Sequence, residues 1–377
     1  MRIKKVDLHY SHEYGPRVAT IEFEGGQSVQ TPDRALNSSE LAYKTRGLCW
    51  QPWDHTVFEL VRNLDERKLH DLAGRNGPMA AEIKHAASAF KKTAGKVRLF
   101  FPRLAFVDLT DPEIRTLIDL QRLGGADMIC LPDSRPGDLL NRFEKMLKGS
   151  REYLEMAFGS GLEPFPLIDM REPADRFSAK VLTCLDMGFK LIAFRYASPT
   201  QTYANYRFLA DHNRHEVWFH LSGVERFWRQ NYTTSQLHIP QFAGVDTVSL
   251  DIPTGGRYTV TDYYKVKRYD PRSIGHLDRA MHLQRYDQDL ACSCQLCSGK
   301  QLDEFYDKNV IGPKSKKPMV HRLRRVAAIH EAFSSRDEFA VGRQRILNGE
   351  VAEYVSSKEF LGPALTVQQL TPATKES

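Results

Sequence analysis

The chain has 377 residues, and its 53 Lys and Arg against 47 Asp and Glu give a formal net charge of +6 at pH 7. Its 41% hydrophobic and 27% charged residues are typical of a soluble globular protein and exclude wholesale disorder. No stretch approaches the ~20 apolar residues that cross a bilayer, and no apolar segment follows the basic residues at the amino end, as a secretory signal would require. We therefore expect a soluble, cytoplasmic protein with no membrane partner.

The amino-terminal region predicts a β-hairpin. Residues 18–23 alternate between apolar and polar side chains, Gly25 and Gly26 turn the chain, and residues 28–32 return.

From about residue 98 onward, short apolar runs alternate with amphipathic segments. The runs, each typical of a buried strand, are residues 98–101, 128–131, 165–168, 190–194, 217–221 and 245–250. The helical segments between them include residues 111–123, 173–187 and 200–212. Repeated strand–helix units indicate a parallel sheet. Because there are at least six such units and no glycine-rich dinucleotide turn, we predict an α/β fold of the (β/α)8 TIM-barrel type.

Polar residues follow several predicted strands. In a barrel the chemistry sits where the strands end, and these positions hold Asp133, Asp169, Arg195, Tyr196, Ser222 and Asp251. Any one of them alone is an ordinary turn former. Three carboxylates at corresponding strand ends are expected to converge on one mouth, where proximity and burial separate their pKa values into different roles.

Three of the six cysteines, Cys292, Cys294 and Cys297, lie within one hexapeptide. Thiolates at this spacing reach one Zn²⁺ ion at about 2.3 Å each, and a closed tetrahedron needs a fourth ligand. His321 and His330 are the two candidates, and we favour His330 because the helical pattern around it would hold the imidazole rigidly. The prediction is a structural zinc site.

The other cysteines, Cys49, Cys130 and Cys184, stand singly among apolar residues and are expected to be small buried hydrophobes. With the zinc cluster, the chain divides into a hairpin plus barrel (1–275), a zinc subdomain with closing helices (276–362) and a flexible tail (363–377).

Basic residues run through two segments that flank the cysteine cluster. The first is rich in tyrosine and contains Arg257, Lys265, Lys267, Arg268 and Arg272; the second contains Lys314, Lys316, Lys317, Arg322, Arg324 and Arg325. Such runs are often only solvated faces. Their position and the interleaved tyrosines favour contact with the phosphates of a nucleic acid, with an affinity that falls steeply with salt.

These features together resemble the tRNA-guanine transglycosylase superfamily. The resemblance rests on the Cys-x-Cys-x2-Cys cluster with its later helical His330, on residues 109–129 leading to Asp133, on residues 244–254, and on the opening hairpin. It implies a TIM barrel with a zinc subdomain, a base-binding aspartate at Asp133, a nucleophilic aspartate and a homodimer. An ungapped match puts Ser249 at the nucleophile, and a gapped match puts Asp251 there. We choose Asp251 because serine lacks the carboxylate.

The departures from the family concern its substrate loops. The Asp-Ser-Gly-Gly-Phe-Gln string that supplies a second catalytic aspartate is absent, and after Phe100–Arg103 no carboxylate occurs before Asp108, the substitute candidate for the acid/base. Residues 194–197, with Arg195 and Tyr196, replace the glycine-rich base-binding loop, and Gly255-Gly256 with Arg257 replace a tRNA-contacting arginine. A chain that keeps the barrel and the zinc site but differs in the tRNA-contacting loops resembles the DNA-modifying, DpdA-type branch of the family.

That resemblance implies exchange of guanine in DNA for a 7-deazaguanine base such as 7-cyano-7-deazaguanine. Asp251 would attack the sugar C1′ and form a covalent intermediate, on a nucleotide flipped out of the duplex with or without helper proteins. Asp133 and Asp169 would accept hydrogen bonds from the base, and Phe101, Phe194 and Tyr196 would sandwich it unless they belong to the barrel core. The alternatives are a transglycosylase acting on tRNA and a catalytically silent barrel that binds nucleic acid.

Overall fold

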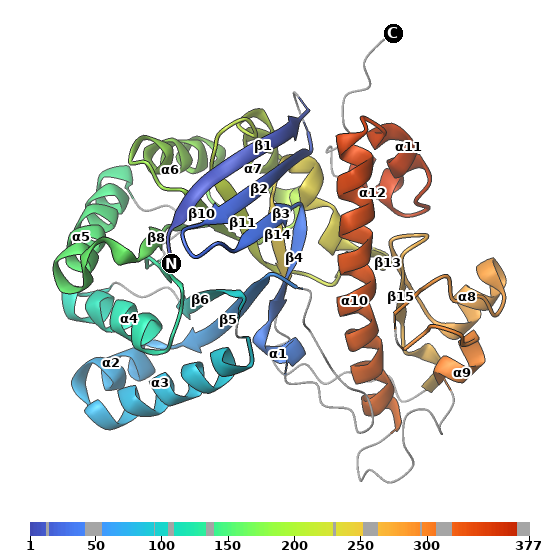
Figure 1. Ribbon diagram of the computed structural model, residues 1–377, viewed down its shortest axis with the longest axis horizontal. Helices are drawn as coiled ribbons and strands as arrows, with labels where there is room; N and C mark the ends of the chain where they lie inside the picture. The colour runs from blue at the N-terminus through green and yellow to red at the C-terminus, as the bar shows by residue number, and fades with distance from the viewer. Residues whose placement is uncertain are drawn as a thin grey trace.

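The computed structural model of the chain describes residues 1–12, 15–41, 55–93, 95–104, 109–132, 139–228, 231–251, 263–294, 296–306 and 319–367. It is an α/β structure with a parallel barrel, a small sheet on one side and one long carboxyl-terminal helix (Figure 1). Asp108, Asp133, Arg257 and Cys49 lie outside the described residues. Within those residues, no helix combines the length and the apolarity needed to cross a bilayer.

The barrel is a nine-stranded parallel sheet in the order β8-β7-β6-β5-β4-β14-β11-β10-β9. Its two end strands are consecutive in the chain and are separated only by Pro166, whose carbonyl accepts a hydrogen bond from Ala193 of β10. Counting β8 and β9 as one interrupted strand gives the eight strands of a (β/α)8 barrel. The strands are β4 (Asp33–Asn37), β5 (Val57–Leu64), β6 (Val97–Leu104), β7 (Met128–Cys130), β8 (Glu163–Phe165), β9 (Leu167–Asp169), β10 (Leu191–Arg195), β11 (Trp218–Val224) and β14 (Thr247–Leu250).

Helices surround the sheet and follow most of its strands (Figure 1). The predicted TIM-barrel class is confirmed: all six predicted runs form barrel strands, and the three predicted helices are α4, α6 and α7. The helices on this layer are α1 (Ser38–Leu41), α2 (Glu66–Gly74), α3 (Asn76–Phe90), α4 (Asp111–Leu123), α5 (Leu140–Phe158), α6 (Ala174–Asp186) and α7 (Pro199–Asp211), with 3-10 turns at η1 (Lys91–Thr93), η2 (Gly159–Gly161), η3 (Gln236–His238) and η4 (Pro240–Ala243).

Alternation along each strand separates two cores. In β6, Phe101 points into the barrel and packs on Phe165, whereas Phe100 points outward to Phe90 of α3. The predicted hairpin is confirmed as β2 (Arg17–Phe23) and β3 (Ser28–Thr31), and β1 (Ile3–Ser11) completes a three-stranded antiparallel sheet.

This sheet covers the end of the barrel at which the strands begin. The Phe23 ring lies 6.0 Å from that of Trp218, the first residue of β11. The amino end of the sheet is tied down in the same place, because the Met1 amino group donates to the Asp127 carbonyl just before β7. The other end of the barrel, where the strands finish, is therefore the end left for a functional mouth.

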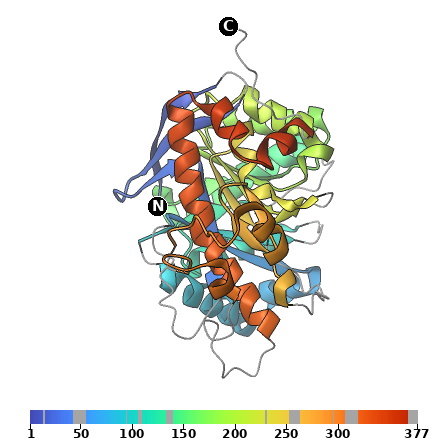
Figure 2. The ribbon, with the colours of Figure 1, turned by 90° about the vertical axis from the view of Figure 1, so that its right-hand side faces the viewer.

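The long helix α10 (Met319–Leu347) runs along the side of the barrel (Figures 1 and 2). Arg34 of β4 ties it there, donating to the Glu331 carbonyl at 2.9 Å and to Ser335 Oγ at 2.7 Å. Beyond α10 lies a four-stranded sheet in the order β12-β13-β16-β15. The remaining elements are β12 (Phe227–Trp228), β13 (Asn231–Ser235), η5 (Tyr263–Lys265), β15 (Arg268–Asp270), β16 (Gly275–Leu277), α8 (Arg279–Tyr286), α9 (Leu302–Tyr306), α11 (Val351–Ser356) and α12 (Leu361–Val367).

Both predicted domain limits fall within secondary-structure elements. The limit at residue 275 falls on the first residue of β16, in the sheet that joins the barrel insertion β13 to the metal-cluster region. The tail predicted to start at residue 363 does not start there, because residues 363–367 belong to α12 and its Leu365 is fully buried.

Candidate active site and metal centre

The three clustered cysteines meet His330 in one place. Cys292, Cys294 and Cys297 come from the segment between α8 and α9, and His330 comes from the middle of α10; their four ligand atoms all lie within 4.8 Å of one another. The Sγ atoms of Cys294 and Cys297 are each 3.3 Å from His330 Nδ1, and that of Cys292 is 3.8 Å away. Sulfur and nitrogen ligands of a tetrahedral zinc ion stand about 3.5 Å apart. The four residues therefore fit one metal ion.

The surroundings orient these ligands. His330 Nε2 lies 2.7 Å from the Tyr269 carbonyl of β15, so with Nδ1 directed at the cluster Nε2 carries the proton and donates it. Such an outer hydrogen bond is the usual way in which a metal-binding imidazole is fixed. The Cys297 amide donates to the Cys294 carbonyl at 2.9 Å and forms the turn that brings the two thiols together. The alternative ligand, His321, is exposed on the first turns of α10 and is not part of the cluster.

Crowding of the three thiols sets their electrostatics. Hydrogen bonds with Cys292 and Cys294 raise the pKa of Cys297 well above its usual range, and hydrogen bonds from Cys294 and Cys297 lower the pKa of Cys292 far below it. Three thiolates cannot share this buried space without a compensating charge. A divalent cation bound there would supply that charge and allow all three to ionise.

At the open end of the barrel, Asp251 pairs with Arg103. Arg103 Nη1 donates to Asp251 Oδ1 at 2.8 Å. Arg103 lies on β6 and Asp251 follows β14, and β5 and β4 stand between these two strands in the sheet. The contact therefore spans the mouth. Gly223 makes room for the arginine: a Cβ there would lie 2.8 Å from Arg103 Nη2, and its φ of +80° suits glycine. The Asp251 side chain keeps 40% of its surface exposed. It is an accessible carboxylate held by a cation.

The alternative nucleophile is not accessible. Ser249 is fully buried in β14, and its hydroxyl accepts a hydrogen bond from the Gly223 amide at 3.2 Å. Of the two residues to which the family resemblance points, only Asp251 reaches the mouth.

A buried polar network lies just below the mouth, and of its residues only Ser222 was among those predicted from the sequence. Glu59 of β5 accepts a hydrogen bond from Ser222 Oγ at 2.7 Å and lies 2.9 Å from His220 Nε2. His220 Nδ1 in turn lies 2.8 Å from Thr247 Oγ1, which also accepts from Trp218 Nε1 at 2.7 Å. We call these five residues the interior network. Each position fits the inward alternation of its strand, but β5 was not predicted and single polar residues within apolar runs carry no distinctive pattern.

Asp169 is not the base-binding carboxylate that we expected. Its side chain is fully buried, and Arg171 takes both of its oxygens through Nε at 2.9 Å and Nη2 at 2.5 Å. Arg195 Nη1 lies 3.8 Å from the same carboxylate. Asp169 therefore holds two arginines near the end of β9, and those guanidinium groups are the ones that a ligand could meet.

The predicted aromatic sandwich is also corrected. Phe101 is 2% exposed and stacks on His220 inside the barrel, with 5.4 Å between the ring centroids. Phe194 is fully buried between the sheet and the helices, against Phe177. Both serve as core residues because their strands place them there. Tyr196 is half-buried, and its hydroxyl lies 3.3 Å from Gln236 Oε1.

The basic residues predicted to contact nucleic acid include both buried and exposed side chains. Arg268 is 1% exposed, with its guanidinium among Asp270, His282 and His330, so the prediction that it binds phosphate is wrong. Lys265 is exposed, and Lys267 is half-buried, where burial lowers its pKa.

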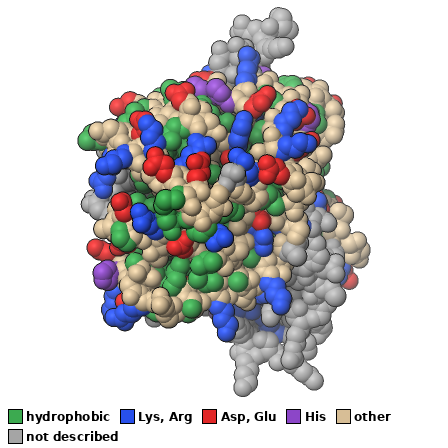
Figure 3. Space-filling model, turned by 60° about the vertical axis from the view of Figure 1, so that its left-hand side comes forward, with side chains coloured by type: hydrophobic (Ala, Val, Ile, Leu, Met, Phe, Trp, Pro, Cys, Tyr) green, Lys and Arg blue, Asp and Glu red, His purple; other side chains and the backbone are tan. Residues whose placement is uncertain are grey.

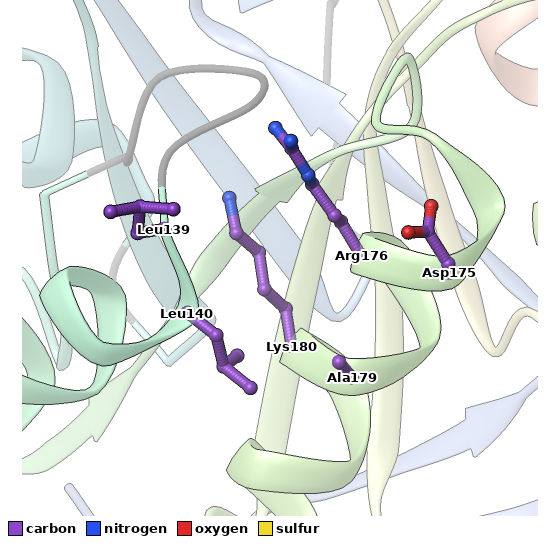
Figure 4. A pocket seen from close by; sticks show the side chains of 6 residues that line it. All are labelled: Leu139, Leu140, Asp175, Arg176, Ala179 and Lys180. Atoms are coloured by element: carbon purple, nitrogen blue, oxygen red, sulfur yellow. The ribbon is translucent and has the colours of Figure 1, made fainter.

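Two further surface features lie on the helices around the barrel. A pocket of about 210 Å³ lies between the start of α5 and α6, lined by leucine, lysine and arginine side chains (Figure 4). Over the outer helices at the left of Figure 1, Lys and Arg are interspersed with Asp and Glu instead of forming one basic patch (Figure 3). Pairs such as Lys148 with Glu144 account for this pattern, which does not favour that face for binding nucleic acid.

A scan against models of protein families finds no match, and a search of curated proteins finds none either. What the chain does therefore has to follow from its own side chains.

Proposed function

We propose that the protein is a transglycosylase that exchanges guanine in DNA for a 7-deazaguanine base, with Asp251 as the nucleophile. The observation that carries the proposal is the accessible Asp251 carboxylate at the carboxyl end of β14, held by Arg103 at 2.8 Å. Chemistry on a barrel scaffold belongs at this end of the strands. The family resemblance and the Cys₃His cluster support the same assignment.

The geometry divides the roles of the two Asp251 oxygens. Arg103 engages Oδ1, which leaves Oδ2 to attack C1′ of the flipped nucleotide. The C1′–N bond breaks, its electron pair leaves with guanine, and an aspartyl-sugar ester forms. The incoming base then attacks C1′ and the carboxylate is released. Two displacements at one carbon retain the configuration of the sugar.

We assign the metal as zinc and its role as structural. Three thiolates and one imidazole form a soft tetrahedral set that leaves no open coordination position. When bound, the ion supplies a cross-link between the cysteine segment and α10. His330 also donates to Tyr269, so the same cross-link reaches β15. The exposed Lys265 in the adjoining η5 turn is the basic residue that we assign to the DNA backbone.

An exchange assay tests this function. The protein is incubated with labelled guanine and, separately, single-stranded DNA, duplex DNA and tRNA; label that stays with the polymer is counted, and 7-cyano-7-deazaguanine is added as a competing base. We expect label in DNA, suppression by the competitor, and none with Asp251→Asn. Label in tRNA alone would support the tRNA alternative.

The catalytically silent alternative has one observation in its favour. The Arg103 guanidinium already neutralises the carboxylate that would attack, and it stands near the place where the family has its second aspartate. Binding of DNA without exchange on any of the three polymers would support that alternative and overturn the proposed function.

A further inference from the structure

Within the part of the chain that the structure describes, the interior network contains two ionisable groups, Glu59 and His220, that the proposed mechanism does not yet use. Glu59 and His220 are both fully buried. Among the described residues, His220 is the only cationic or titratable side chain for which an ion pair with Glu59 is seen. Burying a carboxylate against a single imidazole is costly, and an apolar pair of similar volume would often stabilise the barrel more. The network therefore calls for an explanation other than stability.

Hydrogen-bond chemistry fixes the direction of the network. Trp218 Nε1 only donates, so Thr247 Oγ1 accepts from it at 2.7 Å. Glu59 Oε2 accepts from His220 Nε2–H at 2.9 Å, so in a neutral imidazole Nδ1 is unprotonated and accepts from the Thr247 hydroxyl at 2.8 Å. His220 is thus a fixed donor aimed at one oxygen of Glu59. It stabilises negative charge on that carboxylate without itself giving up a proton.

The other oxygen of Glu59 connects to the mouth. Glu59 Oε1 lies 2.7 Å from Ser222 Oγ, and Ser222 immediately precedes Gly223, where a Cβ would lie 3.6 Å from Asp251 Oδ1. Ser222 is 5% exposed and ends the inward-facing series of β11 that begins with Trp218 and His220. Its hydroxyl is therefore the one link between the buried carboxylate and the surroundings of the nucleophile that these contacts describe.

We propose that Glu59, acting through the Ser222 hydroxyl, holds the proton that base exchange requires, in place of the acid that is missing from the end of β6. The inference rests on the proposed function. In the structure the Ser222 hydroxyl donates to Glu59. In the first half-reaction that hydroxyl turns to donate its proton to the departing ring nitrogen, which keeps the electron pair of the broken C1′–N bond, and protonated Glu59 donates its own proton to Ser222 in return. Glu59 becomes a carboxylate that His220 Nε2–H stabilises.

The second half-reaction reverses the transfer. The incoming base gives its ring N–H proton to Ser222, Ser222 passes its own to Glu59, and the freed electron pair forms the new C1′–N bond. The C1′–O bond to Asp251 breaks, and its pair returns to the carboxylate. One base leaves, one base enters, and no net proton is consumed or released.

The test uses two leaving bases. Guanine needs a proton to depart, whereas 7-methylguanine in DNA is already cationic and departs as a neutral base without one. A site that accepts a substituent at position 7 of the incoming base has room for that methyl group. The rate of covalent protein–DNA adduct formation is measured for both substrates with the wild type, Glu59→Gln and Ser222→Ala, after metal content and urea midpoint show that each variant is folded.

We expect both variants to form the adduct about 10²- to 10⁴-fold more slowly with guanine, and within a few-fold of the wild type with 7-methylguanine. Equal slowing on both substrates would show a structural role, and no slowing on guanine would show no role; either result overturns the inference. Ser222→Ala keeps the Glu59–His220 pair, so it decides the question if Glu59→Gln does not fold. A wild type that forms no adduct with either substrate contradicts the proposed function itself.

Discussion

The guanidinium of Arg103 and the carboxylate of Asp251 meet across the barrel mouth, with 2.8 Å between Nη1 and Oδ1. Gly223 lies beneath this ion pair, and any side chain there would collide with Arg103. A cation therefore stands where the family resemblance leads one to look for a second carboxylate. The two consequences are that Arg103 orients the Asp251 carboxylate and that the acid for the leaving base has to come from elsewhere.

Replacing Arg103 with alanine should slow base exchange by about 10²-fold, because the attacking carboxylate loses the group that orients it. Arg62→Ala is the matched control: Arg62 is also a strand arginine with a carboxylate partner, Glu82, but that pair lies between β5 and α3. Initial exchange rates on DNA check both.

The Gly223→Ala variant tests the same Arg103–Asp251 ion pair. The new Cβ would lie 2.8 Å from Arg103 Nη2, so the arginine must move and exchange should fall as it does in Arg103→Ala. Full activity in both variants would mean that the contact has no part in the reaction.

The metal site should hold one equivalent of zinc. Cys294→Ser or His330→Ala should lose the ion and lower the thermal midpoint by more than about 10 °C, since ligand binding energy contributes directly to folding. His321→Ala should keep both, because that residue is exposed and outside the cluster. Metal analysis and thermal unfolding of the purified variants measure both effects. Zinc retained by His330→Ala would refute the ligand set.

Substitution of Arg268 should lower stability, whereas substitution of Lys265 should weaken DNA binding. Arg268→Ala removes a buried guanidinium from Asp270 and is expected to destabilise the protein by about 3 kcal/mol, measured by urea unfolding. Lys265→Ala should leave stability unchanged, weaken DNA binding and reduce the slope of log K against log salt by about one. Unchanged DNA affinity at every salt concentration in Lys265→Ala would remove this residue from the interface.

Stability should fall in mild acid, partly through His238. Burial, followed by the charges of Lys358 and Arg34, holds its pKa well below 6.5. The unfolded chain therefore binds the proton more readily, so the stabilisation is complete above the unfolded pKa and is lost as pH falls below it. Between pH 6.5 and 5 the loss for a fully buried histidine amounts to about 2 kcal/mol.

His238→Gln is the matched variant for this effect. Glutamine keeps an acceptor for the Tyr269 hydroxyl, which lies 2.8 Å from His238 Nε2, but it does not titrate. Urea unfolding at pH 7.5 and pH 5 should show a smaller acid loss in the variant. An identical loss would place the acid sensitivity in other groups.

The sequence predicted the structure correctly where apolar periodicity or the spacing of metal ligands determines it. The apolar runs, the cysteine spacing and the helical setting of His330 predicted the barrel and the four-residue cluster. Strand β4 was missed because Asp33, Arg34 and Asn37 are polar yet buried, each satisfied by a distant partner: Arg34, for example, reaches α10. No local pattern reveals such partners.

The same reason explains the corrected site residues. Arg268 and Asp169 belong to segments that look solvated or catalytic, but tertiary contacts bury them in ion pairs. Arg103 and Glu59, conversely, carry no motif. Only closure of the barrel brings Glu59 to Ser222 on β11 and Arg103 to Asp251, which directly follows β14.

The most direct test of the account is whether Asp251 forms a covalent bond to the sugar of DNA. The protein is incubated with a guanine-containing oligonucleotide without any incoming base, denatured, digested and analysed by mass spectrometry. The account predicts an adduct on the peptide that contains Asp251 and none in Asp251→Asn. An adduct on another residue, or exchange that persists in Asp251→Asn, would contradict it.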